Sequence, residues 1–576
     1  MSSHPKTFLQ EALEKTRKAF LYAAIFSFFI NLMMISLPLY SMQVFDRVIS
    51  SASVETLLIL SLATGFTFFI MGLLSGVRSF VMSRIGEWLD ITVAPRLLEA
   101  SVTRAAAQNL TSGGGQNLRD LANVKNFVTG AGIMTLFDAP WAVIFLAIIY
   151  MIHPLIGFAA LVGGIGLFVL ATMTEISTRK PLNEASKHTI KASNTAEAAT
   201  RNAEVIEAMG MMRHVIAHWQ TNNHESVAES SIASNRSNII MAVSKIIRMF
   251  LQIMVIGLGA YYALQHEITT GGMLACSILT GRALAPFEAA IGIWKSFISA
   301  RDSYRRLNLN LVNSEDVRGR MPLPPPQGEL KLEGVIFRPA RVDKPIIKGV
   351  TFTLLPGESL GLIGPSAAGK STLIKLIVGI WPATIGSIRL DAAEVYKWNR
   401  EDFGRYVGYM PQDVELFAGT VADNIARLQP NPPPEAVIEA ARWAGVHEMI
   451  LRLPKGYETE IGDSGMLLSP GQRQRIGLAR ALYGNPRMLV LDEPNSNLDS
   501  EGEAGLQVAI RTAKERNITT LIVAHRPSII SGVDKIAMMR DGALEAFGPR
   551  EQVLAKYTKP APTGGVARPA VQGGVA

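Results

Sequence analysis

The chain has 576 residues, of which 48% are hydrophobic and only 18% charged, and its formal net charge at pH 7 is +8. This length is too great for one ordinary domain, and a mean hydropathy of +0.22 excludes a wholly water-soluble protein. The single cysteine, Cys276, excludes an intrachain disulfide framework.

Long apolar stretches fill the first half of the chain. A bilayer core of roughly 30 Å needs about 20 apolar residues of helix. Six stretches meet this requirement: 19–45, 56–77, 131–151, 155–174, 240–264 and 270–294. The third and fourth form one uncharged run over 139–174 that is interrupted by His153-Pro154, so a helical hairpin is predicted there. The sequence therefore predicts six membrane spans.

The last two stretches differ from the others because they carry charged residues. These are Lys245, Arg248, Arg282, Glu288 and Lys295. Charges inside a membrane are costly and often functional, so these residues are candidates for lining a pathway. They are equally consistent with helix extensions beyond the bilayer, and both interpretations stay open.

The loop charges predict the orientation. The first apolar stretch follows a basic segment, as the apolar part of a cleaved signal peptide does. It is too long for a signal peptide, however, and lacks an obvious cleavage site. Loops 78–130 and 175–238 hold six and seven Lys or Arg residues, whereas the three short turns hold only Arg47. By the positive-inside rule, the N-terminus, both long loops and everything after about residue 296 face the cytoplasm. The positive charge therefore indicates topology and not nucleic-acid binding.

Composition also predicts the domain boundaries. The long loops show helical patterning and suggest membrane helices that extend into the cytoplasm, with a break at Gly113-Gly-Gly115. The Pro-rich stretch before residue 328 is typical of a semi-rigid spacer. The predicted parts are a short N-terminus 1–18, a membrane domain 19–310, a linker 311–328, a soluble α/β domain 329–556 and a disordered tail 557–576.

Within the soluble domain, GPSAAGKST at 364–372 lies between an apolar strand and an apolar helix. This context makes G-x-x-x-x-G-K-[ST] a strong signal for a phosphate-binding loop. Gly364 and Gly369 let the loop curl so that backbone N–H groups surround the phosphates. Lys370 then reaches the β- and γ-phosphates of ATP, and the Ser371 hydroxyl binds Mg²⁺. The remaining loop residues are Pro365, Ser366, Ala367, Ala368 and Thr372.

Two further strands end in residues suited to this chemistry. The strand 488–491 is followed by Asp492, a candidate Mg²⁺ ligand, and by Glu493, a candidate general base for the attacking water. Two solvated acids at a strand end are the simpler alternative. The strand LIVA ends at His525, which without the other motifs is as readily a structural residue as a functional one.

The order of these motifs resembles the ATP-binding cassette of ABC transporters. GPSAAGKST, Gln412 in YMPQD, LSPGQ at 468–472, LVLDEP, SNLD at 496–499 and His525 follow one another as in that family. With six spans before one cassette, the chain looks like an exporter-type half-transporter. The resemblance implies that Gln412 touches Mg²⁺, that His525 contacts the γ-phosphate and that Asp499 communicates across a dimer.

The LSPGQ segment has a distinct implied role. In the family it binds the γ-phosphate of ATP held by the other cassette of a pair. Ser469 can cap a helix, Pro470 suits the first helical position, and Gly471 and Gln472 complete a positive helix end. One loop and one signature per chain therefore imply a homodimer that closes on two ATP molecules.

Two departures from the general family pattern are informative. Pro470 stands where glycine is more common, and LSPGQ resembles the subgroup of type I secretion ATPase/permeases. SLPLYSMQVFDRVI at 36–49, FDAPW at 137–141 and GGMLACSILTGRALAPFE at 271–288 suggest the same subgroup. At the adenine position, Pro339 replaces the usual aromatic residue, which leaves Phe337 or a residue outside the motif to stack on the base.

The subgroup resemblance implies a bacterial inner-membrane exporter of unfolded proteins, with a periplasmic adaptor, an outer-membrane channel and a secreted protein as partners. The first span begins near residue 19, which leaves no room for the peptidase-like domain of some relatives. A lipid or drug exporter of the same architecture is the alternative, and a membrane-anchored ATPase that moves nothing is a third possibility. The intact loop, signature and Glu493 count against the third.

Overall fold

The computed structural model describes residues 7–108, 114–312, 323–339, 342–462, 465–524 and 526–557. The chain divides into two compact units, Met1–Asp316 and Val317–Ala576. His525, most of the predicted linker and nearly all of the predicted tail lie outside the described residues, as does Gly113 of the predicted break at 113–115.

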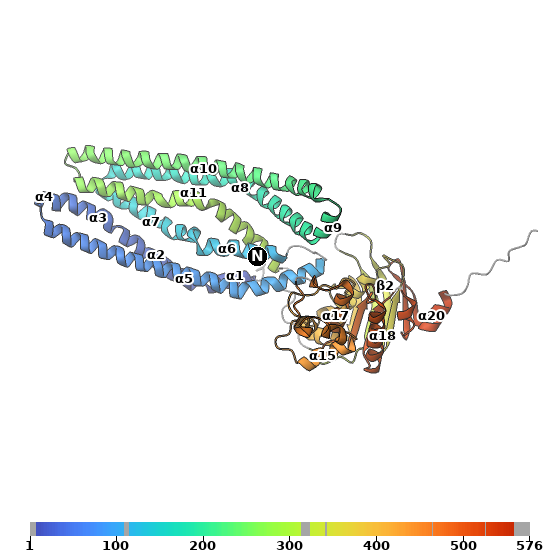
Figure 1. Cartoon of the computed structure of the whole chain (residues 1–576). Coiled ribbons are helices and arrows are strands. Elements are labelled where there is room, and N and C mark those ends of the chain that lie inside the picture. The colour runs from blue at the N-terminus through green and yellow to red at the C-terminus, as the bar shows by residue number, and fades with distance from the viewer. Residues whose placement is uncertain are drawn as a thin grey trace, which may run out of the picture. The chain divides into compact units, whose positions relative to one another are not determined.

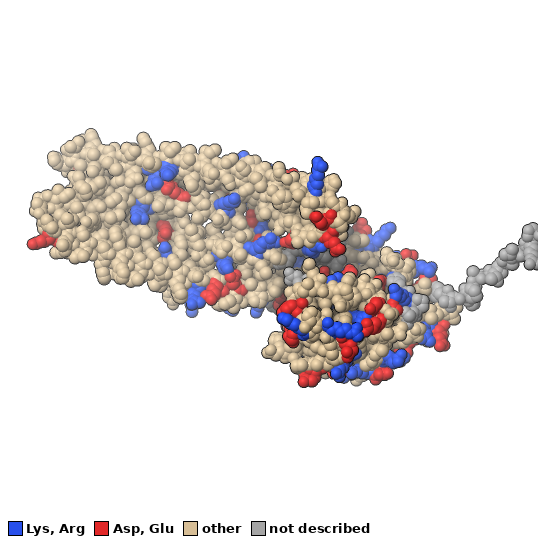
Figure 2. Space-filling view, viewed as in Figure 1, with Lys and Arg blue, Asp and Glu red and all other residues tan. Residues whose placement is uncertain are grey.

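The first unit is entirely helical in its described part (Figure 1). Its elements are α1 (Phe8–Lys15), α2 (Arg17–Met34), α3 (Ser36–Gln43), the π-helix η1 (Val44–Val48), α4 (Ile49–Ser51), α5 (Val54–Gln108), α6 (Gly114–Thr129), α7 (Ala131–Ile152), α8 (Pro154–Arg201), α9 (Ala203–Ala208), α10 (Met212–Leu264) and α11 (Thr270–Val312). Six helical stretches of the described chain are long and apolar enough to cross a membrane, and they contain the six predicted spans. In Figure 2 most of the visible surface of this unit is uncharged.

The first span is broken where the sequence predicts one continuous helix. α2 ends at Met34, Ile35 joins it to α3, and η1 follows at once. Pro38 lies in the first turn of α3 and has no backbone N–H to donate to the preceding turn. The interruption therefore has a local cause in the sequence.

The hairpin and the long extensions are as predicted. His153 ends α7 and Pro154 occupies the first position of α8, where proline's missing N–H costs nothing. α8 and α10 contain 48 and 53 residues, which is far more than about 20 needed to span a bilayer. The short helix α9 connects them.

The charged residues of the last two spans are not equivalent. Arg248 on α10 donates to Glu288 on α11 over 2.7 Å, and both side chains are about three-quarters covered. Lys245, Arg282 and Lys295 are exposed. The pair neutralises two of the charges that would otherwise be costly in the apolar segment.

The second unit contains two sheets. Its strands are β1 (Leu330–Phe337), β2 (Ile347–Leu354), β3 (Ser359–Ile363), β4 (Ile385–Leu390), β5 (Ala393–Glu394), β6 (Val407–Met410), β7 (Met488–Asp492), β8 (Thr519–Val523), β9 (Lys535–Arg540) and β10 (Ala543–Pro549). The smaller sheet is antiparallel with the order β2-β1-β4-β5. The larger has the order β10-β9-β3-β8-β7-β6 and is parallel from β9 to β6.

Helices cover the larger sheet, so its central strands are buried on both faces. Every residue of β7 and β8 is buried, which matches their continuous apolar sequences. The helices are α12 (Lys370–Ile377), η3 (Val395–Lys397), α13 (Arg400–Tyr406), α14 (Val421–Ile425), α15 (Pro434–Trp443), α16 (His447–Leu451), η4 (Gly456–Glu458), α17 (Pro470–Leu482), α18 (Ser500–Glu515), α19 (Pro527–Ile530) and α20 (Arg550–Tyr557). This is the expected α/β domain.

Candidate functional site: a phosphate-binding loop at the edge of the parallel sheet

The carboxyl ends of neighbouring parallel strands carry the candidate residues. The loop 364–369 follows β3, Asp492 ends β7, and Gln412 comes two residues after β6. In the sheet, β8 lies between β3 and β7, and β6 adjoins β7. Since the carboxyl ends of parallel strands meet at one edge, residues far apart in sequence come together there.

The loop conformation depends on glycine. Gly364 has φ 151°, and a Cβ atom on it would lie 2.2 Å from the Met539 backbone oxygen, so no other residue fits. Ala367 also has a positive φ, of 63°, an uncommon conformation for a residue with a side chain. This curled backbone leads directly into the N-terminus of α12, the kind of position at which proteins bind phosphate.

Lys370 closes the loop on itself. Its Nζ donates to the backbone oxygens of Gly364 and Pro365, each over 2.9 Å. Burial lowers the pKa of Lys370, while the charges of Glu493 and Asp492 oppose that shift. A cation held by two carbonyl oxygens can be transferred to a phosphate oxygen with little rearrangement of the loop.

Asp492 has the character of a metal ligand. It is only 4% exposed, and its Oδ1 atom has no hydrogen-bond partner among the described residues. Burial raises the pKa of Asp492, and a hydrogen bond from Ser371 opposes this shift. A buried carboxylate oxygen without a partner, next to a hydroxyl at the phosphate-binding loop, suits Mg²⁺, which prefers oxygen ligands.

Glu493 lies at the end of the same strand in a strained backbone conformation. Its φ is 50°, which is rare for a residue other than glycine and points to a functional constraint. Gln412 Nε2 donates to Glu493 Oε2 over 3.1 Å. The pair therefore connects the segment after β6 to the candidate general base.

A cavity of about 440 Å³ brings the loop together with Gln412 and Glu493, whereas Asp492 is not among the residues that line it. It is lined by Ile346, Ser366, Ala367, Gly369, Lys370, Ser371, Thr372, Gln412 and Glu493. Ile346 has no counterpart in the sequence analysis, since an apolar residue next to the start of β2 gives no functional signal. Gly364, Pro365 and Ala368 shape the loop behind this lining.

The signature segment forms a well-capped helix start. Ser469 accepts a hydrogen bond from the Gln472 backbone N–H over 3.2 Å, and the Gln472 side chain accepts one from the Ser469 N–H over 2.8 Å. Pro470 occupies the first position of α17, as the sequence predicts. A Cβ atom on Gly471 would lie 2.8 Å from the Asn497 backbone oxygen, so glycine permits close approach here.

Asp499 is held by two independent contacts. It caps α18 by accepting from the Gly502 N–H over 2.9 Å, and Arg475 of α17 donates to its carboxylate. These two hydrogen bonds lower the pKa of Asp499. Arg475 is buried, and it escaped the sequence analysis because its partner lies on another helix.

The signature residues do not reach the cavity. Neither Ser469, Gly471 and Gln472 nor Asp499 is among the described residues that line it. His525 lies outside the described residues, so its predicted place beside the cavity stays a prediction. The four signature-side residues therefore lie apart from this cavity in the described unit.

Phe337 does not present a free ring for adenine. It is 9% exposed and stacks on Trp381, with ring centroids 5.1 Å apart and an interplanar angle of 10°. Lys375 Nζ lies 4.8 Å from the centroid of the Trp381 ring. Adenine stacking by Phe337 would require this buried pair to separate.

Two protein families match the two units. The ABC transporter family matches residues 347–496, and the ABC transporter transmembrane region matches residues 20–284. A bacterial Atm1-family ABC exporter solved with ATP bound has the same fold, with a TM-score of 0.82 over 94% of this chain and 96% of that chain at 21% identity.

Secretion proteins are similar over nearly the whole chain. The type I secretion system ATP-binding protein PrsD of Rhizobium meliloti (strain 1021) is 42% identical over 95% of this chain and 94% of its own length. The cyclolysin secretion/processing ATP-binding protein CyaB of Bordetella pertussis is 29% identical over 94% of this chain and 77% of its own length. The leukotoxin translocation ATP-binding protein LktB of Mannheimia haemolytica is 29% identical over 95% and 78%. The chain therefore belongs to the ABC transporters, as a multi-pass membrane protein with a transport-coupled, nucleotide-binding ATPase domain.

Proposed function

We propose that this chain is the ATP-driven inner-membrane exporter of a type I secretion system and that its cargo is an unfolded protein. The similarity to PrsD over nearly the entire length supports this proposal, as do the names of the toxin-exporting relatives. A periplasmic adaptor and an outer-membrane channel are its proposed partners. The soluble unit faces the cytoplasm, where ATP is available.

We further propose that two copies of the chain form two ATP sites. The observation that carries this proposal is the separation of the signature from the cavity in one unit. Each site then consists of the phosphate-binding loop of one chain and the signature of its partner. The capped N-terminus of α17 supplies backbone donors and a positive dipole end for the γ-phosphate.

The side chains of the cavity have separable roles in hydrolysis. The Lys370 ammonium group moves from the backbone oxygens of Gly364 and Pro365 to phosphate oxygens of ATP. Glu493 accepts the proton of the attacking water. Gln412 orients Glu493 through their hydrogen bond. Ser371, Asp492 and Gln412 are the proposed Mg²⁺ ligands, and bound Mg²⁺ neutralises charge on the β- and γ-phosphates.

The shared-site arrangement can be tested by mixing variants. A dimer of one Lys370→Ala chain and one Gly471→Glu chain should keep ATPase activity above background, at no more than about half the wild-type rate, because both defects fall in one site and the other site stays intact. A dimer of a wild-type chain and a Lys370→Ala/Gly471→Glu chain has the same changes but a defect in each site, so it should be inactive. The opposite ranking would refute shared sites.

The cargo and partners can be tested with Glu493→Gln, which should bind ATP and hydrolyse it very slowly. The variant is purified from native membranes with ATP and Mg²⁺, and co-purifying proteins are identified by mass spectrometry. Lys370→Ala, which should not bind ATP, is the matched control. Recovery of an adaptor, a channel or a secreted protein only with Glu493→Gln supports protein secretion. ATPase stimulation by a lipid or drug, with no such protein, would refute it.

A further inference from the structure

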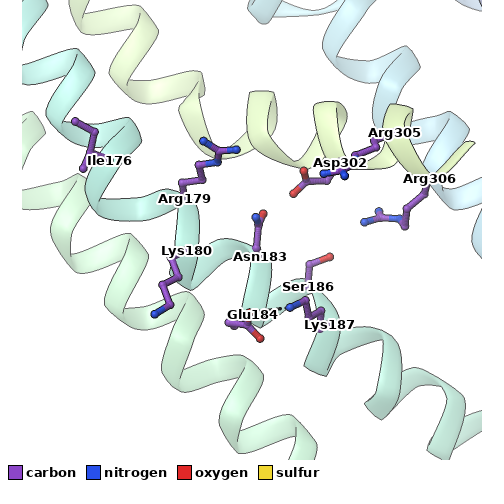
Figure 3. Close-up of a pocket in the computed structure, with 10 residues that line it drawn as sticks. All are labelled: Ile176, Arg179, Lys180, Asn183, Glu184, Ser186, Lys187, Asp302, Arg305 and Arg306. Carbon is purple, nitrogen blue, oxygen red and sulfur yellow. Dashed lines mark hydrogen bonds and ion pairs between the residues drawn. The ribbon is translucent and has the colours of Figure 1, made fainter. Parts of the chain in front are cut away.

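A cavity of about 400 Å³ lies in the helical unit between α8 and α11 (Figure 3). Its polar lining includes five cationic and two acidic side chains, which gives the lining a net charge of +3. The cations are Arg179, Lys180, Lys187, Arg305 and Arg306, and the acids are Glu184 and Asp302. In Figure 3 Arg179 and Asn183 of α8 point toward α11, whereas the Lys180 side chain extends in the other direction.

Two of the cations are already neutralised. Lys187 donates to Glu184 over 2.8 Å, and Arg306 donates two hydrogen bonds to the buried Asp120, of 2.9 and 2.7 Å. Arg179, Lys180 and Arg305 are exposed and form no ion pair within the described part of the chain. These three cations outnumber the one remaining acid of the lining, Asp302, so the cavity favours an anionic ligand.

The position of the cavity along α8 indicates where this ligand comes from. One face of α8 carries exposed apolar side chains at helical spacing: Phe158, Val162, Ile165, Val169, Met173 and Ile176. At 1.5 Å per residue this stripe is about 27 Å long, close to the roughly 30 Å of a bilayer core. Ile176, which is 79% exposed, is its last member and also lines the cavity.

The cations continue this same face. Lys180 follows Ile176 by four residues, which places it on the same side of the helix about 6 Å further along. Arg179 flanks it on the cavity side (Figure 3). In a bilayer, an apolar stripe of this length lies along the acyl chains, and cations at its end lie at the level of the headgroup phosphates.

We propose that this cavity, bounded by Arg179, Lys180 and Arg305, binds the headgroup of an anionic phospholipid from the cytoplasmic leaflet. The phosphodiester occupies the space among the three cations, and the acyl chains lie along the stripe on α8. Basic pockets between membrane helices on the cytoplasmic side are known to bind such headgroups. Nothing in this proposal depends on the identity of the exported cargo.

Asn183 refines the chemistry of the headgroup. Its Oδ1 atom is buried in the cavity lining and has no hydrogen-bond partner among the described residues. A buried acceptor without a donor is costly, so a ligand that donates a hydrogen bond is favoured. A phosphoglycerol headgroup supplies both the negative charge and hydroxyl donors.

The test measures lipid binding directly, without ATP or cargo, so its outcome is independent of the proposed transport function. The full-length protein is reconstituted in phosphatidylcholine with a minor fraction of photoactivatable phosphatidylglycerol, and cross-linked peptides are quantified by mass spectrometry. The test variant is R179Q/K180Q/R305Q, which removes only exposed, unpaired charges. The control is K15Q/R17Q/K18Q, which removes three exposed charges outside the cavity.

Cross-linking to peptides of α8 and α11 should fall at least about tenfold in the test variant and less than about twofold in the control. An equal fall in both would mean diffuse attraction only and would overturn the proposal. Loss of cross-linking when inorganic phosphate is added would assign the cavity to a free anion instead. Unchanged cross-linking, combined with lost binding of a fluorescent poly-glutamate peptide, would assign it to an acidic segment of a polypeptide.

Discussion

Asp492→Asn should stabilise the nucleotide-free ATP-binding unit while it abolishes hydrolysis. The wild-type carboxylate is buried, and one of its oxygens has no hydrogen-bond partner among the described residues. Leaving a buried charged acceptor unsatisfied costs about 1–3 kcal/mol. The asparagine amide removes the charge but still lacks a full set of partners. We therefore expect a net gain of about 1 kcal/mol in the free energy of unfolding, or about 3 °C in Tm.

The sign of this effect depends on pH. Because the pKa of Asp492 is raised in the folded protein, the folded state binds this proton more readily than the unfolded state. The stabilisation that comes from protonated Asp492 is therefore fully present below the ordinary pKa of 3.8, and it is lost as pH rises through the raised pKa. The advantage of Asp492→Asn should accordingly be largest at neutral pH and should shrink as pH falls toward 4.

Thermal unfolding of the full-length protein in detergent, followed by tryptophan fluorescence, measures this effect. The relevant transition is the one that ATP and Mg²⁺ shift upward in the wild type. Asp534→Asn is the matched control, because burial tends to raise the pKa of Asp534 but hydrogen bonds from Lys514 and Ser359 outweigh it and lower that pKa. The control should therefore be destabilised at neutral pH. A Tm of Asp492→Asn equal to or below wild type at pH 7 would refute the reasoning.

Three further substitutions test other parts of the structure. Ser469→Ala removes the cap of α17 and should cost about 1 kcal/mol, seen as a lower Tm together with reduced ATPase activity; an unchanged Tm would contradict the capping contribution. Gly364→Ala should abolish binding of a fluorescent ATP analogue, whereas Gly404→Ala, which has open space around its Cβ position, should leave binding unchanged. Arg248→Gln and Glu288→Gln should each lower the yield of folded protein in detergent more than the double variant does, because a single change leaves a charge unpaired in the span; equal yields would argue against the pair.

Local patterns in the sequence account for much of the fold. Apolar runs of bilayer length give the six spans, and Pro154 gives the hairpin, because both signals depend only on neighbouring residues. Pro470 and Ser469 likewise specify the start of α17 through local hydrogen bonds. The glycine loop after β3 is equally local, since its spacing sets the backbone path.

Contacts between distant residues could not be predicted in the same way. The Arg248–Glu288 pair joins residues 40 positions apart. The Phe337–Trp381 stack joins the end of β1 to the segment that follows α12. A single sequence offers no periodicity or spacing that selects one such partner over another. For the same reason, the sequence singled out Asp499 but not Arg475, which holds it.

The contacts of α17 suggest how two shared sites would influence each other. Buried Gln474 accepts from the Asn497 N–H over 2.8 Å and donates to the Glu493 backbone oxygen over 3.3 Å, while Arg475 donates to Asp499. The signature helix is therefore bonded to the whole segment that begins at the candidate general base of its own cavity. In the proposed dimer the same helix contacts ATP bound by the partner. A displacement of Glu493 during hydrolysis in one site would consequently act on the phosphate contacts of the other through a continuous set of hydrogen bonds. Such a path favours alternating over independent hydrolysis in the two sites.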